Sequence, residues 1–105
     1  MARPTEHGEV WVAALDKARP VVIVSRDDVA GRRDSATVAA ITRTVRGLPT
    51  EVDLDHRDGF PDPCVVNCDD LVTIRKARLD RRIGRLSGTK IDSLDDALRF
   101  ALQLR

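Results

Sequence analysis

Short hydrophobic runs, many of them rich in β-branched residues, alternate with polar segments along most of the chain. Runs of this kind, bounded by turn-forming residues, are typical of strands. The runs at 8–15 and 20–25 are separated by a short polar link, which predicts an antiparallel hairpin. Further strands are predicted at 37–42, 51–54, 64–67, 71–74 and 83–86, with loops at 26–36 and 55–63 and a turn at 47–50.

The period of the pattern changes at the C-terminal end. Ile91, Leu94, Leu98, Ala101 and Leu102 recur at spacings of three and four residues, which places them on one face of a helix. Many short strands followed by one amphipathic helix predict a mostly β (α+β) fold, a small barrel or curled sheet of antiparallel strands with a C-terminal helix. At 105 residues the chain is expected to form a single domain, residues 1–105.

Composition is consistent with a folded protein, because 42% of the residues are hydrophobic and 33% are charged. No run approaches the length of a membrane-spanning helix, and the first residues lack the apolar stretch of a signal peptide. We therefore expect a cytoplasmic protein with no membrane partner.

The net charge of +1 conceals an uneven distribution of charge. Six of the eleven residues from 75 to 85 are basic, whereas acidic residues gather at 51–58, 69–70 and 92–96. The basic run fits either a solvated face or a surface that binds phosphate groups.

Cys64 and Cys68 are the only cysteines, and Cys64 begins a predicted strand that Cys68 directly follows. Four residues of strand span roughly 13 Å, well beyond the roughly 7 Å limit between the Cα atoms of a disulfide. We therefore expect two free thiols in the core, and we expect Trp11 to be a core residue as well.

Motifs for familiar catalytic sites are missing, including a nucleophile elbow, a phosphate-binding glycine loop and a paired histidine motif. His7 and His56 are far apart in sequence, and we expect both to be exposed to solvent. Aromatic residues make up only 3% of the chain, so a platform for stacking RNA bases is not evident. What remains is a set of side chains at strand ends that suit phosphate recognition: Arg19, Ser25, Thr42, Arg43, Thr44, Asp69 and Asp70.

Arg19 precedes Pro20 at the start of a hydrophobic strand. It is either a solvated flank or a group placed over a site. The segments GEVWVAALD, RPVVIVS, VAAIT followed by RTVRGLPTEV, CVVNCDDLVTI, RIGRLS and LDDALRFAL occur in this order over almost the whole chain. In this order they resemble the MazF/PemK (Kid-like) toxins of bacterial toxin–antitoxin modules.

The resemblance implies an SH3-like barrel, a homodimer, and sequence-specific cleavage of single-stranded RNA without a metal or another cofactor. By position in the motifs, Arg19 and Thr42 match the catalytic arginine and threonine, and Asp69 matches an aspartate of the Kid branch and is the candidate base. Three departures weaken the match: Asn67 stands where the Kid pattern has arginine, the link at 16–18 replaces a longer loop, and Val72 stands where relatives often have arginine.

The resemblance also implies partners. RNA-binding residues are expected among the neighbouring polar and basic side chains, namely Ser25, Arg43, Thr44, Arg75, Arg78 and Arg81. A cognate MazE-like antitoxin with an acidic C-terminal segment is expected to bind the dimer.

Two other functions remain open from the residues. A CcdB-like toxin of the same fold inhibits DNA gyrase by binding protein, but this function depends on a C-terminal tryptophan, and this chain ends in ALQLR. A noncatalytic SH3-like binding module would need an aromatic groove, for which the chain has few residues.

Overall fold

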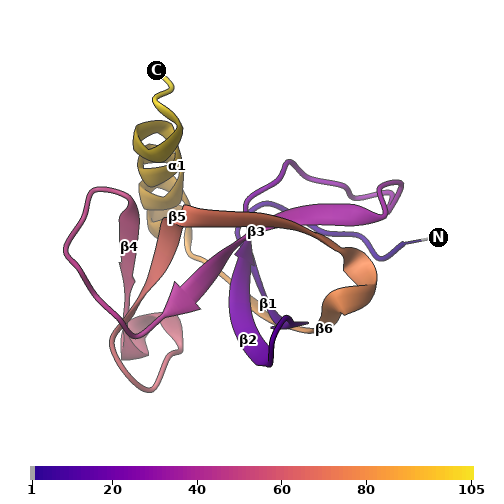
Figure 1. Cartoon of the computed structure of the whole chain (residues 1–105), viewed down its shortest axis with the longest axis horizontal. Coiled ribbons are helices and arrows are strands. Elements are labelled where there is room, and N and C mark those ends of the chain that lie inside the picture. Colours follow the sequence, from indigo (N-terminus) through magenta and orange to yellow (C-terminus); the bar gives the residue numbers. More distant parts are fainter. Residues whose placement is uncertain (1) are drawn as a thin grey trace.

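Six strands form one strongly curled antiparallel sheet in the computed structural model, which describes residues 2–105 (Figure 1). The sheet order is β4-β5-β3-β2-β1-β6, and a C-terminal helix follows the last strand. The elements are β1 (Glu9–Ala14), β2 (Ala18–Ile23), β3 (Ser35–Thr42), β4 (Glu51–Leu54), η1 (His56–Asp58), β5 (Cys64–Arg75), η2 (Lys76–Arg78), β6 (Leu79–Arg85) and α1 (Gly88–Leu102). The predicted mostly β fold with a C-terminal helix is confirmed.

Both faces of the central strands are buried, and this explains the nearly continuous hydrophobic run in β2. Val22 belongs to a core cluster that includes Leu94 of α1, whereas Val21 and Ile23 belong to a second cluster around Trp11. Successive residues of a strand point to opposite faces, so a strand covered on both sides needs apolar residues at every position. Trp11 is a core residue, as predicted, and its indole N–H donates to Glu9.

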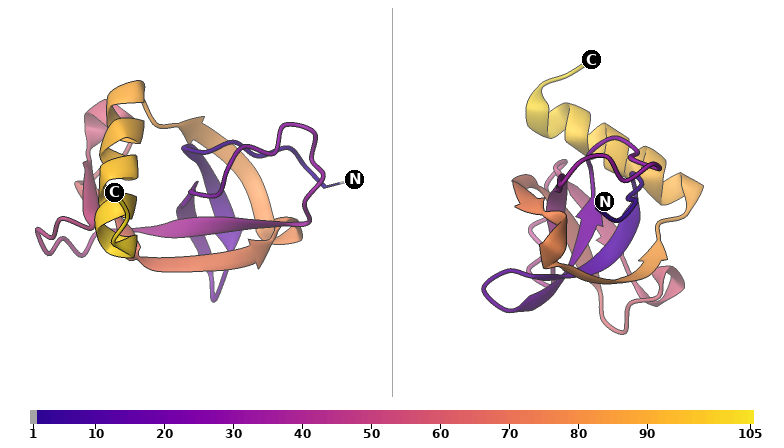
Figure 2. Two further views of the ribbon diagram at one scale, coloured as in Figure 1. Left: turned by 90° about the horizontal axis from the view of Figure 1, so that it is seen from above. Right: turned by 90° about the vertical axis from the view of Figure 1, so that its right-hand side faces the viewer.

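Helix α1 contacts β4 and β5, and it lies on the opposite side of the molecule from the first few described residues (Figures 1 and 2). Leu94 and Ala97 are buried, and Ile91, Leu98 and Ala101 pack against the same cluster. Leu102 was expected on this face but is 53% exposed, because the helix ends there.

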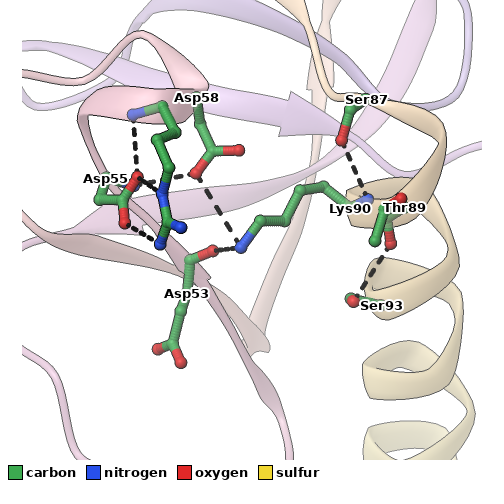
Figure 3. Close-up of polar contacts among 8 residues, drawn as sticks. Asp53, Asp55, Asp58, Ser87, Thr89, Lys90 and Ser93 are labelled. Carbon is green, nitrogen blue, oxygen red and sulfur yellow. Dashed lines mark hydrogen bonds and ion pairs between the residues drawn. The ribbon is translucent and has the colours of Figure 1, made fainter.

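Lys90 attaches the first turn of α1 to β4 and to the short helix η1 that follows it (Figure 3). Its ammonium group donates to the backbone oxygen of Asp53 and lies 3.9 Å from the carboxylate of Asp58. Ser87 caps the helix by accepting from the backbone N–H of Lys90. These contacts fix the helix against the edge strand β4.

His7 is a second attachment point for α1 and corrects the expectation of an exposed histidine. Its Nε2 lies 2.6 Å from Oδ1 of Asp95, and its Nδ1 lies 3.0 Å from the backbone oxygen of Val24. His56, in contrast, is exposed as expected.

Strand β5 is longer than the sequence indicated. The predicted strands at 64–67 and 71–74 are one continuous strand, Cys64–Arg75, with a bulge against β3. Ala39 pairs with Leu71, but its neighbour Ala40 pairs with Asn67, so residues 68–70 bulge out of the register. The prediction of a last strand at 83–86 was also wrong in its bounds, because β6 begins at Leu79.

The cysteines agree with the prediction. Cys64 and Cys68 are buried free thiols, and burial raises the pKa of Cys68 to about 11. A high pKa keeps the thiol protonated and unreactive near neutral pH.

Candidate active site

Arg19 and Thr42 come together because β2 and β3 are neighbours in the sheet. Val21 pairs with Ala40 in the antiparallel register. Continuing this register by two residues places Arg19 opposite Thr42, where β3 ends. Directly opposite side chains of an antiparallel pair share one face, and both residues line the same surface hollows.

Two adjoining hollows meet at this point. Arg19, Ile41, Thr42 and Thr44 line both of them. The first hollow has a volume of about 410 Å³, and its other lining residues are Leu15, Asp16, Ala40, Arg46, Glu51, Asn67 and Asp70. The second has a volume of about 590 Å³ and extends over Lys17, Ala18, Pro20, Arg43, Phe60, Pro61, Asp62 and Cys64.

Asp16 holds the guanidinium of Arg19 through two parallel hydrogen bonds. Nε of Arg19 donates to Oδ1 at 2.9 Å, and Nη2 donates to Oδ2 at 3.2 Å. The hydrogen bond from Arg19 lowers the pKa of Asp16 from its ordinary value of 3.8 to about 2, and the same bond raises the pKa of Arg19. The pair occupies one edge of the guanidinium and leaves Nη1 for another ligand.

The hydroxyl of Thr42 has a defined orientation. Its Oγ1 accepts a hydrogen bond from the backbone N–H of Thr44 at 3.1 Å. A hydroxyl group that accepts one bond can still donate its own hydrogen. Thr42 can therefore donate to an oxygen placed between it and Arg19.

Asp69 and Asp70 both lie in the bulge of β5, but they differ in position. Oδ2 of Asp69 accepts the hydroxyl hydrogen of Thr50 at 2.6 Å, and Asp69 is not among the residues that line either hollow. Asp70 lines the first hollow. The structure thus places Arg19 and Thr42 together, and Asp70 rather than the predicted Asp69 lines a hollow with them.

The predicted RNA-binding residues separate into two groups. Arg43 and Thr44 line the second hollow, where Nη1 of Arg43 is 3.4 Å from Oδ2 of Asp62. The other predicted residues do not line either hollow: Ser25, Arg75, Arg78 and Arg81. Ser25 follows the far end of β2 from Arg19, and its hydroxyl accepts from the backbone N–H of Thr37.

Three charged residues that line the first hollow were not identified from the sequence, namely Asp16, Arg46 and Glu51. Asp16 could have been found from its spacing of three residues from Arg19 across a tight hairpin. The other two depend on the path of the loop between β3 and β4, for which the sequence gives only a turn signal.

Two further observations concern the described chain as a whole rather than the site alone. Among residues 2–105, no three His, Cys, Asp or Glu side chains gather closely enough to hold a metal ion. The same part of the chain contains no helix with both the length and the apolar character needed to cross a membrane.

Comparison with known proteins identifies the family. Residues 6–102 match the model of the PemK-like, MazF-like toxins of type II toxin–antitoxin systems. The chain belongs to the PemK/MazF-like toxin family. The recognition made from the sequence motifs is thereby confirmed.

Individual family members are similar over nearly their full length. Endoribonuclease MazF3 of Mycobacterium tuberculosis is 44% identical over 95 residues, which cover 90% of this chain and 92% of the relative. The solved structure of the M. tuberculosis toxin MazF-mt6 is 43% identical, with a TM-score of 0.86 over 92% of this chain and 98% of that one. A mycobacterial endoribonuclease solved in complex with its cognate antitoxin is 26% identical, with a TM-score of 0.85 over 96% of this chain and 97% of that one.

Proposed function

We propose that this PemK/MazF-like protein is the toxin of a type II toxin–antitoxin system and acts as a sequence-specific, metal-independent endoribonuclease on single-stranded RNA. The observation that carries the proposal is the juxtaposition of Arg19 and Thr42 at adjoining hollows in a chain that belongs to this family. The two curated or solved relatives described above that carry an activity in their names are endoribonucleases. The gyrase-inhibitor and binding-module alternatives are not favoured by these findings.

RNA supplies its own nucleophile. The 2′-oxygen attacks the adjacent phosphorus, its proton passes to a base, the bond from phosphorus to the 5′-oxygen breaks, and that oxygen takes up a proton. The products are a 2′,3′-cyclic phosphate and a 5′-hydroxyl group. The protein has to orient these atoms and stabilise the negative charge of the phosphorane.

Arg19 and Thr42 are suited to this charge stabilisation. Guanidinium stays protonated at all physiological pH values, so Arg19 acts as a hydrogen-bond donor to the phosphate rather than as the base. Thr42 donates a second hydrogen bond from the opposite strand. Because Asp16 binds Nε and Nη2 of Arg19, Nη1 is the nitrogen that remains to contact the substrate.

The base belongs to the carboxylates of the β5 bulge. The family resemblance favours Asp69, whereas the lining of the first hollow favours Asp70. Asp69→Asn and Asp70→Asn compared over a range of pH values separate the two. Loss of the acidic limb of the pH–rate profile in only one variant identifies the base.

The chemistry is tested by incubating the purified protein with single-stranded RNA in EDTA and sequencing the fragment ends. We expect cleavage at defined sites, with cyclic phosphate and 5′-hydroxyl ends, and no cleavage where the scissile nucleotide is 2′-deoxy. Arg19→Ala protein, purified in the same way, controls for contaminating nucleases. A requirement for magnesium, or cleavage at the 2′-deoxy position, would contradict the mechanism.

The proposed partners follow the family. A homodimer should give about twice the chain mass of 11.6 kDa in light scattering. A cognate antitoxin is the second expected partner, because a mycobacterial relative was solved in complex with its own antitoxin. From the family resemblance, we expect the antitoxin to bind through an acidic C-terminal segment.

A further inference from the structure

The loop between β3 and β4, residues 43–50, forms one wall of the first hollow and carries Thr44 and Arg46 into it. The loop has no helix or strand of its own, and most of its side chains are exposed. Its shape therefore depends on a few specific contacts.

Glu51, the first residue of β4, supplies these contacts. Its Oε1 accepts hydrogen bonds from the backbone N–H groups of Arg46 at 3.1 Å, Gly47 at 2.8 Å and Leu48 at 3.2 Å. The backbone N–H of Glu51 donates in return to the oxygen of Leu48 at 3.0 Å. One carboxylate thus satisfies three successive backbone donors.

Gly47 makes this convergence possible. Its φ of +70° lies in the left-handed region, which turns consecutive N–H groups toward one side and produces an anion-binding nest. A Cβ at this position would meet no atom within 4 Å, so the backbone conformation, rather than space, requires glycine.

The charges around the first hollow explain why the loop matters for RNA. Its ionised lining groups are Asp16, Arg19, Arg46, Glu51 and Asp70. Arg19 is paired with Asp16 but keeps Nη1 for a ligand, the nest offsets the charge of Glu51, and Asp70 is the third carboxylate. Arg46 is then the second cation available to a phosphate backbone, and its position depends on the loop that Glu51 holds.

We propose that Glu51 is a positioning residue of the RNA-cleavage site, which holds loop 43–50 so that Arg46 contacts the RNA phosphate backbone beside Arg19 and Thr42. This inference rests on the proposed function. Glu51 acts through the loop, since its carboxylate is directed at backbone donors rather than at the substrate.

The test uses Glu51→Ala, Glu51→Gln, Arg46→Ala and the double variant Glu51→Ala/Arg46→Ala. Asp53→Ala is the matched control, because Asp53 is an exposed acidic residue on the same strand, two positions along. Binding is measured by fluorescence anisotropy with single-stranded RNA that carries 2′-deoxy nucleotides and cannot be cleaved, and cleavage is measured in single turnover at saturating RNA.

We expect Glu51→Ala and Arg46→Ala each to weaken RNA binding about tenfold, the effect of losing one charge-assisted contact. The maximal cleavage rate should change less than about threefold, and the double variant should bind no more weakly than either single variant. Glu51→Gln should recover part of the affinity, because its amide oxygen still accepts, and Asp53→Ala should bind like the wild type.

Several outcomes would overturn the inference. Additive effects in the double variant would mean that Glu51 does not act through Arg46. Loss of the acidic limb of the pH–rate profile in Glu51→Gln would make Glu51 the base instead. Unchanged hydrogen exchange at the amides of Arg46, Gly47 and Leu48 in Glu51→Ala would show that the carboxylate does not hold the loop.

Failure of the proposed function gives a different result. Wild-type protein that binds RNA in EDTA without cutting it would contradict the nuclease mechanism, and the affinities of the variants would still decide the role of Glu51. If the wild type does not bind single-stranded RNA, both proposals fail.

Discussion

Arg19 is oriented before any substrate arrives. Two of its nitrogens are bonded to Asp16, so the direction of the guanidinium is set by a hairpin of only three linking residues rather than by a long covering loop. Preorganised donors are effective because they need no rearrangement when the phosphorane charge develops.

The shape of the guanidinium, as well as its charge, is therefore expected to matter. Arg19→Lys keeps the positive charge but loses the planar set of donors, so we expect it to be nearly as inactive as Arg19→Ala. Loss of one such contact costs about 100- to 1000-fold in rate, and Thr42→Ala should cost somewhat less because its hydrogen bond is neutral. Single-turnover cleavage and melting curves measure both properties, and wild-type-like cleavage by Arg19→Lys would reduce Arg19 to a point charge.

The Asp16–Arg19 pair gives a prediction about pH. The folded-state pKa of Asp16 is about 2 and lies below the ordinary value of 3.8, so the pair stabilises the fold above about pH 4 and this contribution is lost as the pH falls toward 2. Cleavage between pH 5 and 8 should show no titration of this carboxylate. Carbon NMR of the Asp16 side chain should give a midpoint near 2 in the wild type and a higher one in Arg19→Ala, still below 3.8 because the backbone N–H of Lys17 also donates to this carboxylate. Equal midpoints in the two proteins would contradict the pairing.

Residues of the site differ in how far the sequence could reveal them. Arg19 and Thr42 were predicted from motifs at fixed positions in two neighbouring strands, and their proximity follows from strand register. Asp70 lines the first hollow because of a bulge in β5. The bulge shifts the strand register, and the hydrophobic periodicity of the sequence does not reveal this shift. Glu51 binds backbone N–H groups, and because such groups are the same in every sequence, no side-chain motif marks this role.

At the scale of elements, helix α1 was predictable because its apolar residues keep one helical period. The strands were predictable in number and order except where a bulge interrupts the alternation. Asp69 and Asp70 break the pattern within β5 and divide one strand into two apparent ones. Strand β6 begins within the basic run, where exposed charged residues obscure its start.

Leu94 anchors α1 to the sheet, and its side chain is fully buried. Leu94→Ala removes apolar contacts and leaves a cavity, so we expect a loss of about 3 kcal/mol in the free energy of unfolding and a decrease of more than about 10 °C in Tm. Asp92→Ala, an exposed change on the same helix, should stay within about 0.5 kcal/mol. Calorimetry measures both, and similar melting of the two variants would contradict the packing of the helix.

At the scale of the whole molecule, the basic run at 75–85 is not one uniform surface. Lys76 is 2% exposed, and its ammonium lies 2.5 Å from Asp28 and 2.8 Å from the backbone oxygen of Arg3, where it holds the N-terminal segment. Arg82 is paired with Glu9, and Arg85 lies 3.7 Å from Glu6. Arg75, Arg78 and Arg81 are the other exposed arginines of the run. Arg78 donates to the backbone oxygen of Ala14, and Arg81 lies 3.2 Å from its neighbour Asp80, so both are held only at the surface.

These three arginines test whether the surface binds the acidic segment of the antitoxin. If it does, changing all three to glutamate should weaken binding roughly 10- to 100-fold, because each exposed ion pair contributes little by itself and like charges repel. The loss should come mainly from slower association and should shrink at high salt. The control for total charge is Arg26→Glu/Arg32→Glu/Arg105→Glu, which reverses three exposed arginines outside the basic run. Stopped-flow association with the cognate antitoxin at two salt concentrations measures the effect, and equal association rates for the triple variant and the wild type would make the basic run a solvated face.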